Sequence, residues 1–98
     1  MLTSKQRAYL RGLANTLSPI LHAGKGGVSD AMTKQADDAL TARELLKGRV
    51  LETAPADTRA VAEEIAAAVH AEVVQVVGRT FVLYRRNEKQ PVIELPRA

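Results

Sequence analysis

Hydrophobic residues recur along this chain at two spacings, which together predict three helices and four strands. Apolar positions three and four residues apart predict helices over residues 5–17, from about 29 to 43, and 58–69. Ser4 and Asp57 are the expected N-caps of the first and third helices, and Ser29 or a neighbour opens the second. Runs rich in β-formers and bounded by turn signals predict strands over residues 20–23, 45–52, 72–77 and 80–85. The last two runs flank Gly78-Arg79, which is typical of a tight hairpin. The predicted order is therefore α-β-α-β-α-β-β.

This order predicts an α/β fold with one four-stranded mixed sheet packed by helices. Two successive strand–helix–strand units imply right-handed crossovers between parallel neighbours, and the terminal hairpin adds an antiparallel strand. We expect a single domain over residues 1–98, in which residues 87–98 form a tail with a short extended piece at 92–95. Gly48 occupies a position in the second strand where a β-former is expected, so it either weakens that strand or marks a bulge.

Composition narrows the class of protein. The 98 residues are 46% hydrophobic and 26% charged, as in an ordinary globular domain, and there is no cysteine for a disulfide or a thiolate. The N-terminus is polar, and no apolar run approaches the ~18 residues that would suggest a membrane span. We therefore expect a cytoplasmic monomer that does not contact membranes.

Charge is distributed unevenly along the chain. Residues 1–29 and 79–98 together carry nine basic and two acidic side chains, whereas residues 30–78 carry nine acidic and five basic ones. Such a division suggests one basic face and one acidic face, with a polyanion as partner. Chance clustering of solvated charges would give the same composition, so charge alone leaves both interpretations open.

The most distinctive stretch is the turn Gly24-Lys25-Gly26-Gly27, which lies between a predicted strand and a predicted helix. It fits the G-x-x-G pattern with which KH domains clamp a nucleic-acid backbone. Backbone amides at Gly26, Gly27 and the start of the helix are candidates to receive a phosphate, and Lys25 adds a charge. The turn matches neither a Walker loop nor the G-x-G-x-x-G fingerprint. The alternative is a tight turn that needs glycine only for a positive φ.

Other side chains argue against base stacking on aromatic rings and against catalysis. We expect Tyr9 and Phe81 in the core and Tyr84 in the core or at its rim, so binding should depend on phosphate and shape. The two histidines are far apart in sequence; His22 is expected to pack at a strand end or to contact RNA beside the turn. We expect no catalytic residue, no metal site, no cofactor and no small-molecule substrate.

The residues that point to a family are the stretches "LTSKQRAYLRGLANTLSPILHAGKGGVSD", "ELLKGRVLE", "VVQVVGRTFVLYRR" and a closing "LPR". In this order, from Leu2 to Arg97, the chain resembles the CRM domain, the RNA-binding module of chloroplast splicing factors and of the stand-alone bacterial YhbY-like proteins. The resemblance implies a fold like the C-terminal domain of bacterial initiation factor three. It also implies binding to precursors of the large ribosomal subunit during assembly. Its RNA-binding positions fall on Gly24, Lys25, Gly26, Gly27, Lys5, Arg7 and Arg11.

Three hypotheses follow. The first is a non-catalytic RNA-binding assembly factor, whose basic patch extends to Lys47, Arg49 and Arg85 if the outer sheet face is open. The second is an adaptor that docks a basic ribosomal protein through the acidic residues Asp37, Asp38, Glu44, Glu63 and Glu64. The third is a nucleotide-dependent enzyme, which the missing Walker pattern and the missing acid–base pair disfavour.

Overall fold

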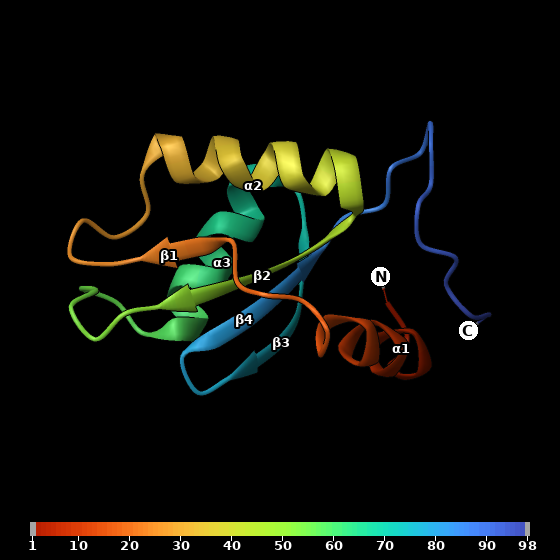
Figure 1. The fold of residues 1–98 in the computed structure, drawn as a ribbon, viewed down its shortest axis with the longest axis horizontal. Helices are drawn as coiled ribbons and strands as arrows, with labels where there is room; N and C mark the ends of the chain where they lie inside the picture. The colour runs from red at the N-terminus through yellow and green to blue at the C-terminus, as the bar shows by residue number, and fades with distance from the viewer. Residues whose placement is uncertain (1, 98) are drawn as a thin grey trace.

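The computed structural model describes residues 2–97 and confirms the predicted α/β fold. Its elements are α1 Ser4–Ala14, β1 Leu21–Ala23, α2 Asp30–Arg43, β2 Leu45–Val50, α3 Thr58–Val69, β3 Glu72–Val77 and β4 Thr80–Tyr84. The four strands form one mixed sheet in the order β1-β2-β4-β3, shown in Figure 1.

The helix ends follow local capping chemistry, with one difference from the prediction. Ser29 and Asp57 cap α2 and α3 as expected, since each side chain accepts a bond from an amide in the first turn. In α1 the cap is Thr3 instead of Ser4, because Thr3 and Gln6 bond reciprocally to each other's backbone amides. This helix also ends at Ala14, earlier than predicted, and the chain tightens there into a turn in which the Leu17 amide donates to the Ala14 carbonyl.

The sheet topology departs from the prediction at the second crossover. β1 and β2 are parallel neighbours, as expected, but β2 and β3 are parallel without being neighbours because β4 lies between them. The hairpin permits either arrangement. β4 takes the central place because four of its five residues are buried, so it needs neighbours on both sides, whereas β3 is mostly half-exposed.

Two hydrophobic clusters lie on opposite faces of the sheet. α2 and α3 cover one face, where they pack against strand residues Leu21, Leu46, Phe81 and Leu83. On the other face α1 and the C-terminal tail pack against Leu45, Val74, Val82 and Tyr84. Among the described residues, no helix covers the rest of that second face (Figure 1). His22 and Arg49 are exposed, and strand alternation places them on this face because the adjacent residues Ala23 and Val50 belong to the first cluster.

The structure corrects two expectations, one about the burial of Tyr9 and one about a bulge at Gly48. Phe81 and Tyr84 are buried as predicted, but Tyr9 is 43% exposed and does not belong to the core. The buried stripe of α1 passes through Leu10, Leu13 and Ala14, and Tyr9 falls just outside it. Gly48 marks no bulge in β2, since it pairs regularly with Phe81; the irregularity is in β3, between Val73 and Gln75.

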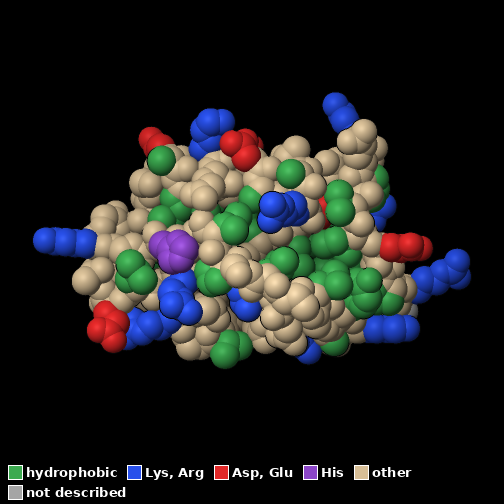
Figure 2. Space-filling model, in the orientation of Figure 1, with side chains coloured by type: hydrophobic (Ala, Val, Ile, Leu, Met, Phe, Trp, Pro, Cys, Tyr) green, Lys and Arg blue, Asp and Glu red, His purple; other side chains and the backbone are tan. Residues whose placement is uncertain are grey.

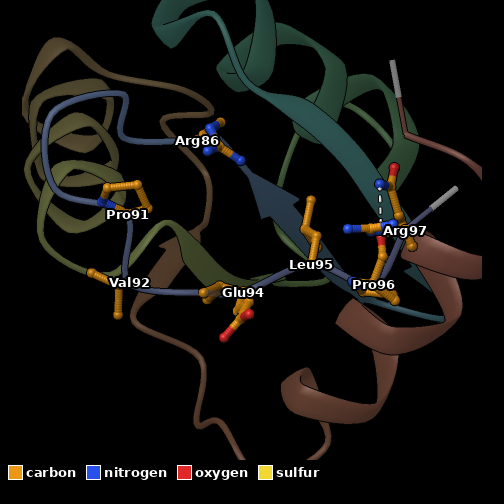
Figure 3. Close-up of a pocket in the computed structure, with 9 residues that line it drawn as sticks. Arg86, Pro91, Val92, Glu94, Leu95, Pro96 and Arg97 are labelled. Atoms are coloured by element: carbon orange, nitrogen blue, oxygen red, sulfur yellow. Dashed lines mark hydrogen bonds between the residues drawn. The ribbon is translucent and has the colours of Figure 1, made fainter.

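The tail adds no strand within the described residues and is held instead by one buried carboxylate. Glu44 is fully buried, and it accepts hydrogen bonds from the amides of Asn87 (2.6 Å), Val92 (2.7 Å) and Ile93 (2.6 Å). Figure 3 shows how the tail from Pro91 to Arg97 curves past Arg86 and borders an open hollow, where Gln6 bonds the Pro96 carbonyl.

Candidate nucleic-acid interface

Three loops meet at one end of the sheet. Because β1, β2 and β3 run in the same direction, their carboxyl ends share one edge, which is where open α/β sheets bind ligands. A Cβ built on Gly24 would lie 3.4 Å from Leu51, and one on Gly27 would lie 3.4 Å from Pro55. The loops after β1 and β2 are therefore packed side by side (Figure 1). The β3–β4 turn joins them, since the Val50 amide donates to the Arg79 carbonyl at 2.7 Å.

The three glycines of the loop differ in whether conformation or packing requires a glycine at the position. Gly27 has φ +66°, and its amide donates to the Gly24 carbonyl at 2.9 Å, so conformation alone explains it. The Gly27 amide closes the turn and already has an acceptor, so it is not one of the free donors of the loop. At Gly26 an added Cβ would meet nothing within 4 Å, and the space around Gly24 is also adequate. Neither packing nor a positive φ requires glycine at these two positions.

Two amides of the loop remain available to a ligand. The amides of Lys25 and Gly26 make no hydrogen bond with any residue in the range 2–97. The Lys25 side chain is exposed and has no carboxylate within ion-pair distance in this part of the chain. A bare turn beside an unpaired ammonium can accept an oxyanion through two backbone donors and one charge.

The start of α2 contributes less than the sequence suggested. Ser29 already accepts a bond from the Met32 amide at 3.2 Å. Asp30 is exposed in the first turn, where its carboxylate complements the helix dipole and repels a second anion. The candidate anion site is therefore the turn itself rather than the helix N-terminus.

The basic residues predicted on α1 do not join the loop. Figure 1 shows α1 and the glycine loop toward opposite ends of the long axis of a molecule 39 Å in extent. Arg7 is also occupied, because its Nη1 donates to the Val73 carbonyl at 2.7 Å and ties α1 to β3. Lys5 is exposed and Arg11 is half-buried. Figure 2 shows Lys and Arg side chains spread along this face instead of gathered in one patch.

Arg85 is a structural residue and does not extend the basic patch. Its guanidinium binds the Asp37 carboxylate at 2.6 Å and the carbonyls of Asp37 and Val69, and it also donates to the Thr41 hydroxyl at 2.9 Å. These bonds fasten the end of β4 to α2 and α3. Lys47 and Arg49 lie on the open face as expected, where Lys47 is half-buried and Arg49 is exposed.

The acidic surface proposed for an adaptor is smaller than the sequence suggested. Glu44 is buried under the tail, and Asp37 binds Arg85. Asp38 lies 3.4 Å from Lys34, and Glu63 lies 3.7 Å from Arg59, both as exposed pairs on one helix turn. Hydrophobic periodicity gave no indication that Glu44 is buried, because the amides that bond its carboxylate lie in the C-terminal tail, far away along the chain.

Within the described range, no group of three or more His, Asp or Glu side chains could hold a metal ion, and no helix is long and apolar enough to cross a membrane.

The sequence matches one protein-family model over most of its length. The family model of the CRS1 / YhbY (CRM) domain matches residues 2–85. This chain belongs to the CRM-domain family. The resemblance read from the sequence is thereby confirmed, and the tail that Glu44 holds lies outside the matched region.

Individual relatives match this chain over nearly its whole length. "Probable RNA-binding protein YqeI" of Bacillus subtilis is 46% identical over 96 residues, which cover 98% of this chain and 100% of the relative. "RNA-binding protein" of Haemophilus influenzae is 32% identical over 98% of this chain and 96% of its own. The solution structure of a candidate RNA-binding protein from Staphylococcus aureus superposes with a TM-score of 0.80 at 46% identity, covering 98% of this chain and 100% of that one.

Proposed function

We propose that this CRM-domain protein binds RNA through the turn Gly24-Lys25-Gly26-Gly27 and acts on precursors of the large ribosomal subunit during their assembly. It works as a cytoplasmic monomer, without catalytic activity of its own. Lys5 and Arg11 of α1 form a second, electrostatic part of the interface toward the other end of the molecule, and Arg7, although its guanidinium is bonded to the Val73 carbonyl, keeps its positive charge and adds to this part. The names of the relatives support RNA as the partner.

The observation that carries the proposal is the unfilled bonding capacity of the turn. The amides of Lys25 and Gly26 have no partner in the described chain, and the turn offers glycine where neither packing nor conformation needs it. Close approach of a ribose-phosphate backbone is the remaining physical reason for such bare positions. The Lys25 ammonium then neutralises one phosphate and releases its counterion.

A salt titration with a fragment of large-subunit rRNA tests the proposal. With about three to four phosphate contacts, log K should fall with log salt at a slope of roughly −2 to −3 on single-stranded segments. An RNA of equal length and unrelated sequence is the control for ribosomal specificity. A response independent of salt would refute binding through phosphates, and equal affinity for both RNAs would refute the ribosomal assignment.

The adaptor alternative makes a different prediction in cells. If the acidic helices docked a ribosomal protein, comigration of this protein with large-subunit precursors in a density gradient would survive digestion of the RNA. We expect nuclease treatment to release it, because the exposed acidic residues are largely paired along their own helices. Comigration that persists after nuclease treatment would favour the adaptor.

A further inference from the structure

We infer that the uncovered part of the sheet beside the glycine loop is a platform for unpaired RNA nucleotides, centred on His22 and Arg49. This inference rests on the proposed function and specifies the form of RNA that the site takes. Charge, planar side chains and continuity with the loop carry it.

The platform is a single row of side chains across all four strands. His22 pairs with Arg49, Arg49 pairs with Thr80, and Thr80 pairs with Val77. Residues directly opposite in adjacent strands have side chains about 5 Å apart on the same face. The row therefore presents imidazole, guanidinium, hydroxyl and isopropyl groups in sequence. His22 and Arg49 are exposed, and Val77 is 58% exposed.

The row adjoins the glycine loop directly. His22 is two residues before Gly24 in β1, and Leu51, which is 41% exposed, lies beside Gly24. The next row along this face leads to Val82, which is buried in the cluster under α1. The platform is thus the strip of sheet that α1 and the tail leave uncovered, and it adjoins the loop. Figure 2 shows a histidine side chain exposed on this face with Lys and Arg side chains near it.

His22 and Arg49 have no competing partner. Neither side chain makes a hydrogen bond or an ion pair with another residue in the range 2–97. Of the acidic side chains at this end, Glu52 lies 3.7 Å from Arg79 at the rim. Asp57 caps α3, and Asp30 lies in the first turn of α2, so neither belongs to the row of strand side chains. Imidazole and guanidinium planes both stack on nucleobases, and they do so only with bases that are not already stacked within a duplex. The row therefore favours looped or single-stranded RNA.

Edge protection is an alternative explanation for His22 alone, since β1 is a short edge strand whereas Arg49 lies on the interior strand β2. The alternative at Arg49 is attraction of phosphate, which needs only a positive charge, whereas stacking needs a planar guanidinium. Arg49→Lys keeps the charge and removes the plane.

The test uses the full chain, a ten-nucleotide single-stranded RNA carrying 2-aminopurine, and a hairpin that pairs the same ten nucleotides. We expect Arg49→Lys and His22→Ala each to weaken single-strand binding by about five- to a hundred-fold, as loss of one stacked base does. The salt slope should stay unchanged in Arg49→Lys, and the fluorescence change on binding should shrink. Arg59→Lys on α3, away from this face, is the matched control and should bind like the wild type.

Two results would overturn the platform. One is an Arg49→Lys variant that binds the single strand as tightly as the wild type; the other is a hairpin bound as tightly as the single strand. If Lys25→Glu still weakens binding in that case, the platform fails while the proposed function stands. If neither RNA binds at low salt, both fail. Unchanged melting temperatures of the variants confirm that the effects are not losses of folding.

Discussion

The ring of Phe81 occupies the space in which a side chain at Gly48 would begin. A Cβ at position 48 would lie 2.2 Å from Cζ of Phe81 and 2.7 Å from each Cε, and Phe81 is buried at the centre of the sheet. Gly48 and Phe81 are opposite each other in β2 and β4, so the ring lies over the glycine. The glycine in this strand is therefore a packing requirement.

We expect Gly48→Ala to lower the free energy of unfolding by about 1–3 kcal/mol, because the ring must move within a close-packed core. Urea denaturation measures the loss. Gly26→Ala is the control, since its Cβ would meet nothing within 4 Å, and it should stay within about 0.5 kcal/mol of the wild type. Equal stability of the two variants would mean that the ring does not lie over Gly48 in solution.

Glu44 fastens the tail, and its replacement should release it. Glu44→Gln keeps the shape but replaces one acceptor oxygen by an amino group facing backbone donors, so we expect a loss of about 1.5–3 kcal/mol. Hydrogen exchange should become faster at the amides of Val92 and Ile93 while the amides of β4 stay protected. Glu88→Gln, which changes an exposed carboxylate, should leave both measurements unchanged.

Glu44 should also make stability depend on pH in the acid range. Burial by itself raises the pKa of Glu44. Hydrogen bonds from the amides of Asn87, Ile93 and Val92, together with the charge of Arg86, lower the pKa by more than burial raises it, so the net pKa lies below the ordinary 4.5. A carboxyl with a lower pKa in the folded chain stabilises the fold while it is ionised.

Its contribution is complete above about pH 4.5 and is lost as the pH falls through the lower pKa of the folded state. The stability difference between wild type and Glu44→Gln should therefore be constant near neutral pH and shrink below pH 4.5. Denaturation curves from pH 7 to pH 3 measure it. A difference that stays constant down to pH 3 would show that the titration of Glu44 is not linked to folding.

The hydroxyl of Tyr84 loses its contact with water on folding and gains no hydrogen bond from or to any of residues 2–97. This burial of the hydroxyl, followed by the charge of Glu44, raises the pKa of Tyr84. Tyr84→Phe removes the desolvated group and keeps the ring, so we expect unchanged stability or a gain of up to about 1 kcal/mol. Tyr9→Phe on the exposed side of α1 is the control, measured by thermal unfolding. Destabilisation by Tyr84→Phe would show that the hydroxyl is hydrogen-bonded in solution.

Lys25 and Lys89 offer a matched pair of exposed lysines, one in the glycine loop and one in the C-terminal tail. We expect Lys25→Glu to weaken binding to large-subunit rRNA about ten-fold more than Lys89→Glu, because only Lys25 adjoins unbonded loop amides. The melting temperature should stay nearly the same in both variants, since neither lysine is buried. Filter binding at fixed salt measures the ratio. Equal losses of affinity would exclude the loop as the principal contact.

Local signals in the sequence determined the secondary structure and the position of the turn. Ser29 and Asp57 indicated the starts of α2 and α3, because an N-cap side chain bonds to amides only a few residues away. Gly78 indicated the hairpin, and the G-x-x-G turn lies between β1 and α2 as predicted. The family followed from the same short motifs, because they lie at fixed positions along the chain.

The tertiary structure alone decided which residues meet. Three features depend on segments that are far apart in sequence. They are the pairing of β4 with β2, the burial of Glu44 by bonds such as that from the Val92 amide, and the exposure of Tyr9. The same holds for the candidate site, since His22 and Arg49 become neighbours only through parallel pairing, while Arg7 and Arg85 are withdrawn by bonds to Val73 and Asp37. Spacing along a chain fixes which side chains share a helix or strand face; which of them stay free depends on where the sheet brings distant segments together.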